Sequence, residues 1–190
     1  MLWIVALAEM FLCWLVWSLA FVKPSRQAAG AKKKAGAPQS RLGIGLVMLG
    51  FACLWAYVRP VGFHKPAWEL VMSMVLGPPS VALAWAATRH LGKQWRYQAA
   101  LLDDHELIRT GPYAWIRHPI YTSMLGMVLT TGFCWTWWPL FLAAVAVFLA
   151  GTEIRVRSED KILAERFGDT FAEYRKSVPA YLPLVRCRAR

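Results

Sequence analysis

The sequence is poor in acidic residues and in cysteine. Of its 190 residues, 11 are Asp or Glu, against 22 that are Lys or Arg. The four cysteines show no paired spacing. Cys13, Cys53 and Cys134 lie in apolar runs, and Cys187 lies near the C-terminus. This pattern indicates neither a disulfide framework nor a zinc site. We therefore expect the cysteines to be packing residues, and we expect no bound metal.

Two processing signals are missing as well. No basic segment precedes the first apolar run and no small-residue cleavage site closes it, so we do not expect a cleavable signal peptide. Arg188 follows Cys187, where a prenylation motif would place an aliphatic residue. We therefore do not expect lipidation of this chain.

Apolar residues dominate what is present. The chain is 57% hydrophobic, contains 11 Trp and has a positive mean hydropathy, which predicts one compact membrane domain with no soluble domain left over. The net charge of +11 would suggest nucleic-acid binding in a soluble protein. Here the basic residues flank apolar runs, where they set orientation and meet anionic lipid. The expected partner is the lipid bilayer, and nucleic acid is not expected.

The apolar runs predict an all-α integral membrane bundle of about five transmembrane helices. Single spans are expected over 2–22, 42–58 and 68–88, and a short helical hairpin over 119–152 with its turn near Trp135 to Trp138. Gly77-Pro78-Pro79 should kink or break the third span, because proline removes backbone hydrogen bonds. Four spans with a re-entrant first or fourth segment are the alternative.

The distribution of basic residues predicts the topology. The polar segments 23–41, 89–117 and 154–190 together hold 20 of the 22 Lys and Arg residues, and the turn 59–67 holds two. By the positive-inside rule, the N-terminus is then outside and the C-terminus cytoplasmic. We treat 1–190 as a single domain, with three spans in 1–88 and the cofactor-binding and catalytic half in 89–190.

Residues 111–121 place rings and cations at the start of an apolar run. Pro119 suits the first turn of a helix, whose unpaired N–H groups attract anions. Tyr113 and Tyr121 offer flat faces to a heteroaromatic ring, while Arg117 and His118 suit a carboxylate or phosphate. This pattern favours a cofactor site; the alternative is that these residues only anchor the chain at the membrane interface.

The segment 153–176 is highly charged and predicts a helix that leaves the membrane. This helix should end at Gly168, and a shorter amphipathic helix should follow it. Most of its charges fit ordinary i,i+4 pairs on a solvated face. Arg155 and Glu159 stand in the less favourable order for such a pair, which hints at another purpose.

Two motifs in this half resemble signatures of the isoprenylcysteine carboxyl methyltransferase family and, more loosely, of membrane phospholipid methyltransferases. The first is Gly-x-Tyr-x-x-x-Arg-His-Pro-x-Tyr over 111–121, and the second runs from Arg155 to Val178-Pro179. Leu91-Gly92-x-x-Trp95 and His105-x-Leu107 are also similar, so the resemblance covers roughly 91–183. Two residues depart from the pattern: Ser123 stands where the family usually has Gly, and Asp160 where it has a second Glu. These departures leave the identity of the substrate undecided.

The resemblance implies an integral membrane enzyme that uses S-adenosylmethionine and methylates the carboxylate of an isoprenylcysteine-like or other lipophilic acceptor. It implies that Arg155 orients that carboxylate through its planar guanidinium, and that Glu159 holds this guanidinium in place. A carboxylate acceptor needs no general base. The implied cofactor-binding residues are His105, Leu107, Gly111, Tyr113, Arg117, His118, Pro119 and Tyr121.

Three other functions stay open at this stage. The first is a methyltransferase whose acceptor is a phospholipid amine or a thiol. A sterol-type NADPH reductase is the second, although such enzymes usually continue Asn-Tyr-x-Gly-acid where this chain reads Ile120-Tyr121-Thr122-Ser123-Met124. The third is a membrane scaffold without a cofactor. Oligomeric state is not indicated.

Overall fold

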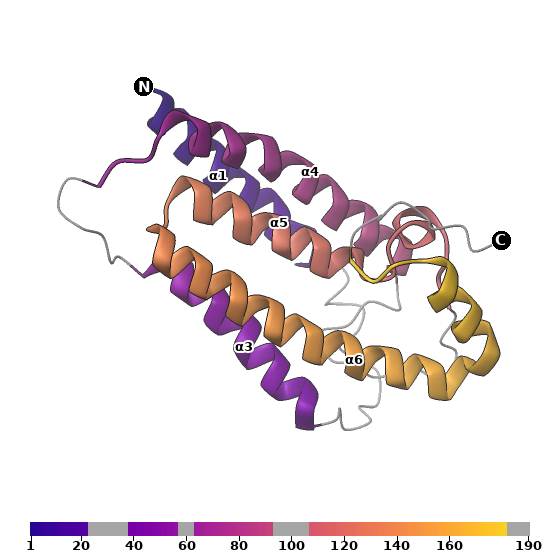
Figure 1. Cartoon of the computed structure of the whole chain (residues 1–190). Helices are drawn as coiled ribbons and strands as arrows, with labels where there is room; N and C mark the ends of the chain where they lie inside the picture. The colour runs from indigo at the N-terminus through magenta and orange to yellow at the C-terminus, as the bar shows by residue number, and fades with distance from the viewer. Residues whose placement is uncertain (23–37, 57–62, 93–106, 182–190) are drawn as a thin grey trace.

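The structure is a computed structural model of the chain and describes residues 1–22, 38–56, 63–92 and 107–181. Within these ranges there are five α-helices, one 3-10 turn and no strand (Figure 1). The elements are α1 (Leu2–Leu19), α3 (Pro38–Trp55), α4 (Ala67–Leu91), η2 (Gly111–Ala114), α5 (Pro119–Cys134) and α6 (Trp138–Ser177). The predicted all-α membrane bundle is confirmed.

Three of the helices are long and apolar enough to cross a membrane, namely α1, α4 and α6. The apolar part of α3 is shorter, from Ser40 to Trp55. Helix α5 has 16 residues, which at 1.5 Å per residue gives about 24 Å, less than a full hydrocarbon layer. The chain is therefore an integral membrane protein. Which side each terminus faces stays a prediction.

The helices form two groups that lie side by side. Helix α4 packs between α1 and α5, while α3 runs along α6 (Figure 1). Helices α5 and α6 are joined at Trp135–Trp137, which confirms the predicted hairpin and its turn. Large buried side chains such as Phe148, Met127 and Met10 fill the core, and Trp14 packs against all three core clusters of the bundle.

The third span does not break at Gly77-Pro78-Pro79, because α4 is continuous from Ala67 to Leu91, and a kink at this point stays a prediction. Neighbouring helices hold this segment. A Cβ at Gly77 would lie 2.9 Å from Cys13 Sγ on α1, and Ser73 Oγ donates a hydrogen bond of 2.8 Å to the Thr130 carbonyl on α5. Prolines are tolerated within membrane helices when such packing compensates for the lost backbone bonds.

A buried ion pair lies at the end of the bundle where α4 begins and α5 ends. Lys65 Nζ lies 2.5 Å from Glu69 Oε2, and both side chains are 3% exposed. Lys65 also donates to the Gly132 carbonyl at 3.0 Å, and Trp138 Nε1 donates to Glu69 Oε1 at 2.9 Å. These bonds tie the start of α4 to the α5–α6 turn.

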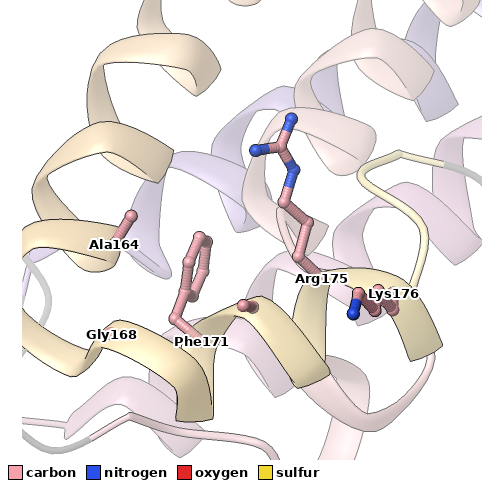
Figure 2. Close-up of a pocket in the computed structure, with 6 residues that line it drawn as sticks. Ala164, Gly168, Phe171, Arg175 and Lys176 are labelled. Atoms are coloured by element: carbon pink, nitrogen blue, oxygen red, sulfur yellow. The ribbon is translucent and has the colours of Figure 1, made fainter.

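Helix α6 bends at Gly168, where φ is +50°. A positive φ suits glycine, which has no Cβ to clash. The last turns of α6 fold back toward the start of α5 (Figure 1), so the predicted end at Gly168 and the shorter helix after it are confirmed. Beside the bend lies a hollow of about 420 Å³, and Phe171, Arg175 and Lys176 are among the residues that line it (Figure 2).

Candidate active site

The η2 turn leads into α5, and its shape explains the first glycine of the motif. Gly111 has a φ of +58°. The ring of His90, at the end of α4, occupies the space that a Cβ would need there. Gly111 therefore brings the turn against α4, and Pro119 then begins α5, as predicted from the sequence.

The residues after α6 form a strap, Val178–Tyr181, that passes the start of α5. The backbone N–H groups of Arg117 and His118 donate to the carbonyls of Pro179 and Ala180 at 2.9 and 3.0 Å. Thr122 Oγ1 donates to the Tyr181 carbonyl at 2.6 Å. The strap therefore engages the N–H groups of the two residues that precede Pro119.

The side chains of Arg117 and His118 reach across to α6. Arg117 Nη1 lies 2.6 Å from Asp160 Oδ2, and its Nε donates to the Val178 carbonyl at 3.0 Å. His118 is 7% exposed. Its Nε2 lies 3.0 Å from Asp160 Oδ1 and its Nδ1 3.5 Å from Glu159 Oε2. One imidazole thus contacts both acids of α6.

A second group of bonds joins Tyr121, Arg155 and Glu159. Tyr121 donates its hydroxyl hydrogen to Glu159 Oε1 at 2.6 Å and accepts a bond of 2.5 Å from Arg155 Nε. Arg155 Nη2 closes the triangle with Glu159 Oε1 at 3.1 Å. Arg155 is 6% exposed, so its charge is balanced within the protein rather than by water.

The ionisation states follow from these contacts, which lie at the start of α5 and beyond the apolar part of α6. Burial alone would lower the pKa of His118, but the hydrogen bonds and charges of Asp160 and Glu159 raise it above its usual value. Burial likewise opposes ionisation of the two acids. Bonds from His118 and from Arg117 lower the pKa of Asp160, and His118 and Arg155 lower that of Glu159. The two acids therefore favour the protonated form of His118, and the neighbouring cations favour the ionised form of both acids.

The structure brings together five of the residues predicted from the sequence: Arg117, His118, Tyr121, Arg155 and Glu159. Tyr113 is buried nearby, and its carbonyl accepts a bond of 2.6 Å from the Tyr174 hydroxyl. Leu107 packs instead on the apolar cluster of the last α6 turns and the strap. His105 lies outside the described residues. The roles assigned to these residues stay predictions.

Two contributors were missed by the sequence analysis. Asp160 was noted only as a departure from the family pattern, yet it holds both Arg117 and His118. Two features of the sequence could have indicated this role: Asp160 is adjacent to Glu159, and the pair Arg117-His118 lies upstream. Ser40 on α3 is buried, and its Oγ lies 3.4 Å from Arg155 Nη1. Nothing in the sequence around Ser40 indicates this contact.

Comparison with known proteins gives a family match for the chain. The chain matches the sequence model of the "Isoprenylcysteine carboxyl methyltransferase (ICMT) family" over residues 66–165. This region extends from the start of α4 into the charged part of α6. It includes the two groups of bonds described above, except for the contributions of Ser40 and the strap.

Curated relatives agree with the family match. The protein-S-isoprenylcysteine O-methyltransferase of Schizosaccharomyces pombe is 28% identical over 137 residues, covering 72% of this chain and 48% of that protein. That of Dictyostelium discoideum is 25% identical over 161 residues, covering 77% and 61%. The uncharacterized protein YpbQ of Bacillus subtilis is 29% identical over 121 residues, covering 62% and 70%. The chain spans about half the length of the S. pombe relative.

Proposed function

The chain belongs to the isoprenylcysteine carboxyl methyltransferase family, and from this premise we propose that it is a membrane methyltransferase. The proposed reaction transfers a methyl group from S-adenosylmethionine to the carboxylate of an isoprenylcysteine-like, lipophilic acceptor. The observation that carries this proposal is the bonding of Arg155 and Glu159 to Tyr121. It places the arginine of one motif against the tyrosine of the other.

The described residues fit the cofactor in chemical kind. S-adenosylmethionine combines a sulfonium, an ammonium, a carboxylate and an adenine ring. Glu159 has the most exposed side chain among the acids of the site, at 24%, and suits a cationic group. The rings of Tyr113 and Tyr121 suit adenine. Both ring nitrogens of His118 face Asp160 and Glu159, so His118 acts on the cofactor through these two acids.

The set of residues that we assign to the cofactor follows from this fit and from the motif. It comprises Leu107, Gly111, Tyr113, Arg117, His118, Pro119 and Tyr121, together with His105 outside the described residues. Gly111 acts through the shape of the turn, because it is exposed and packs beside His90. Arg117 acts through Asp160, which holds its guanidinium.

The protein's own part in the reaction is to orient and to exclude water. When bound, the cofactor supplies an electrophilic methyl group. Arg155 is buried, and Tyr121 and Glu159 hold the plane of its guanidinium. A planar fork held in this way suits the two oxygens of an acceptor carboxylate. A dry site favours the loss of charge when a cation and an anion react to give two neutral groups.

The test is a panel of acceptors with labelled S-adenosylmethionine and the purified protein in detergent. The panel contains S-farnesylcysteine, phosphatidylethanolamine and a small alkyl thiol. We expect label on S-farnesylcysteine that is released as methanol by base, because a methyl ester hydrolyses there and an amine or thioether does not. Label only on the amine or the thiol would contradict the carboxylate assignment, and no label on any acceptor would contradict the activity.

We also propose that the site end of the bundle faces the cytoplasm, since the described basic residues gather toward that end, among them Arg89, Arg109 and Arg117. Exposed positions mark the two ends: Thr110 precedes η2, and Ala67 begins α4. Single cysteines at these positions, in a cysteine-free background, should react with impermeant reagents from opposite sides of sealed vesicles. Labelling from the same side would contradict this topology.

A further inference from the structure

The first turn of α3 reaches the candidate site from outside the region matched by the family. Ser40 is 4% exposed, and its Oγ accepts a hydrogen bond of 3.4 Å from Nη1 of Arg155. The two residues are 115 positions apart. The family match begins only at residue 66, so this contact belongs to a part of the chain to which no role has been assigned.

Glycines allow α3 to approach α6 this closely. A Cβ at Gly43 would lie 2.7 Å from Arg155 Cγ and 2.9 Å from the Gly151 carbonyl oxygen. A Cβ at Gly151 would lie 2.8 Å from the Gly43 carbonyl oxygen. Small residues let helix backbones meet in this way. The stem of Arg155 therefore lies directly against the backbone of α3, and Ser40 is one turn further toward the site.

Among the described residues, three helices therefore contact the Arg155 guanidinium, each at a different nitrogen. Tyr121 of α5 binds Nε, Glu159 of α6 binds Nη2, and Ser40 of α3 binds Nη1. Glu159 contributes a negative charge that partly neutralises the guanidinium. Ser40 differs from it, because a neutral hydroxyl fixes the direction of Nη1 without cancelling charge.

We propose that Ser40 is a positioning residue that sets the direction of the Arg155 guanidinium toward the anionic group of the acceptor. The proposal rests on the function proposed above, because it assumes that Arg155 binds that group. It adds α3 to the structural elements that select the acceptor. The cofactor residues lie on other elements, so Ser40 should influence the acceptor and leave cofactor affinity unchanged.

The experiment compares Ser40→Ala and Ser40→Thr with Gly45→Ala, using S-farnesylcysteine as the acceptor. Gly45 lies on the same helix and has open space around its Cβ position, so it is the matched control. We expect Ser40→Ala to lower kcat/KM for the acceptor about tenfold, since a bond to a charged group is lost. Ser40→Thr keeps a hydroxyl and should restore most of the activity, and Gly45→Ala should match the wild type.

The Arg155→Lys background separates positioning from general damage. If Ser40 acts through Arg155, then Ser40→Ala should cause little further loss in that background. Cofactor affinity and melting temperature are measured for every variant, and both should stay at wild-type values for Ser40→Ala. An equal loss in both backgrounds, or a fall in melting temperature that accounts for the lost activity, would overturn the proposal.

Failure of the two proposals can be distinguished in the same assay. Methyl transfer by the wild type together with unchanged kcat/KM for Ser40→Ala would overturn the role of Ser40 alone. Absence of transfer by the wild type would overturn the proposed function and the role of Ser40 with it.

Discussion

The Tyr121 hydroxyl accepts a 2.5 Å hydrogen bond from the Arg155 guanidinium, although 34 residues separate them along the chain. The same hydroxyl donates a hydrogen bond of 2.6 Å to Glu159 Oε1. This single oxygen therefore links the start of α5 to the charged part of α6. The two sequence motifs meet here.

Tyr121→Phe keeps the ring and removes this shared oxygen. Arg155 and Glu159 would each lose one bond in a buried setting, and we expect turnover to fall about tenfold or more. If the ring stacks on the cofactor, the cofactor dissociation constant should change little. Turnover and isothermal binding measurements check both expectations. Wild-type turnover would remove Tyr121 from the group that orients Arg155.

Asp160→Asn tests whether this acid organises the two cations before Pro119. The substitution keeps the shape of the side chain but removes the charge that faces Arg117 and His118. We expect weaker cofactor binding and a lower melting temperature, because a buried cation loses its counter-charge. Glu165→Gln, on an exposed part of α6, is the control. Equal behaviour of the two variants would contradict an organising role for Asp160.

Stability should depend on pH through His118. Its pKa is raised above 6.5 in the folded protein, so its contribution is fully present below about pH 6.5 and is lost as the pH rises through the folded value. The pKa values of Asp160 and Glu159 are lowered, so their contribution is present above about pH 4.5 and lost as the pH falls further. Stability should therefore be highest between these limits.

The measurement is the melting temperature in detergent from pH 5 to 9, for the wild type and for His118→Gln. The wild type should lose stability on the alkaline side, and the variant should lose less because glutamine does not titrate. Parallel curves for the two proteins would show that another group causes the dependence.

Two ion pairs with the same i,i+4 spacing should differ strongly in their effect on stability. Lys65 and Glu69 have side chains that are 3% exposed, whereas those of Arg157 and Glu153 are 79% and 45% exposed. Glu69→Ala should cost about 3 kcal/mol or more, because it leaves a buried ammonium without its counter-charge. Arg157→Ala should cost less than about 1 kcal/mol. Thermal unfolding measures both effects. A small effect of Glu69→Ala would show that the Lys65–Glu69 pair does not stabilise the contact between the start of α4 and the α5–α6 turn.

Sequence patterns predicted the features that depend on local physics. The hairpin turn before Trp138 follows from a run of apolar residues too long for one helix, and the bend at Gly168 follows from the freedom of glycine at positive φ. That the segments 111–121 and 155–179 contribute to one site was implied only by the resemblance to a family, because periodicity does not pair distant segments. The contact of Tyr121 with Arg155 and Glu159 was not predicted.

The features that the sequence did not predict depend on contacts between helices. The continuity of α4 through Pro78 depends on packing against α1 and α5. The arrival of Ser40 beside Arg155 depends on the glycine contact between α3 and α6. The double role of Asp160 depends on how α5 and α6 face each other. None of these can be derived from the spacing of residues within one helix.

The most direct test measures base-labile methyl ester formation on S-farnesylcysteine by the wild type, Arg155→Lys and Arg157→Lys, with the cofactor dissociation constant of each. Lysine keeps the charge but lacks the planar fork. If Arg155 orients the acceptor carboxylate, Arg155→Lys should form ester at least about tenfold more slowly with nearly unchanged cofactor affinity. Arg157→Lys, at an exposed position, should match the wild type. Absence of ester with the wild-type protein, or wild-type rates with Arg155→Lys, would contradict carboxyl methylation directed by Arg155.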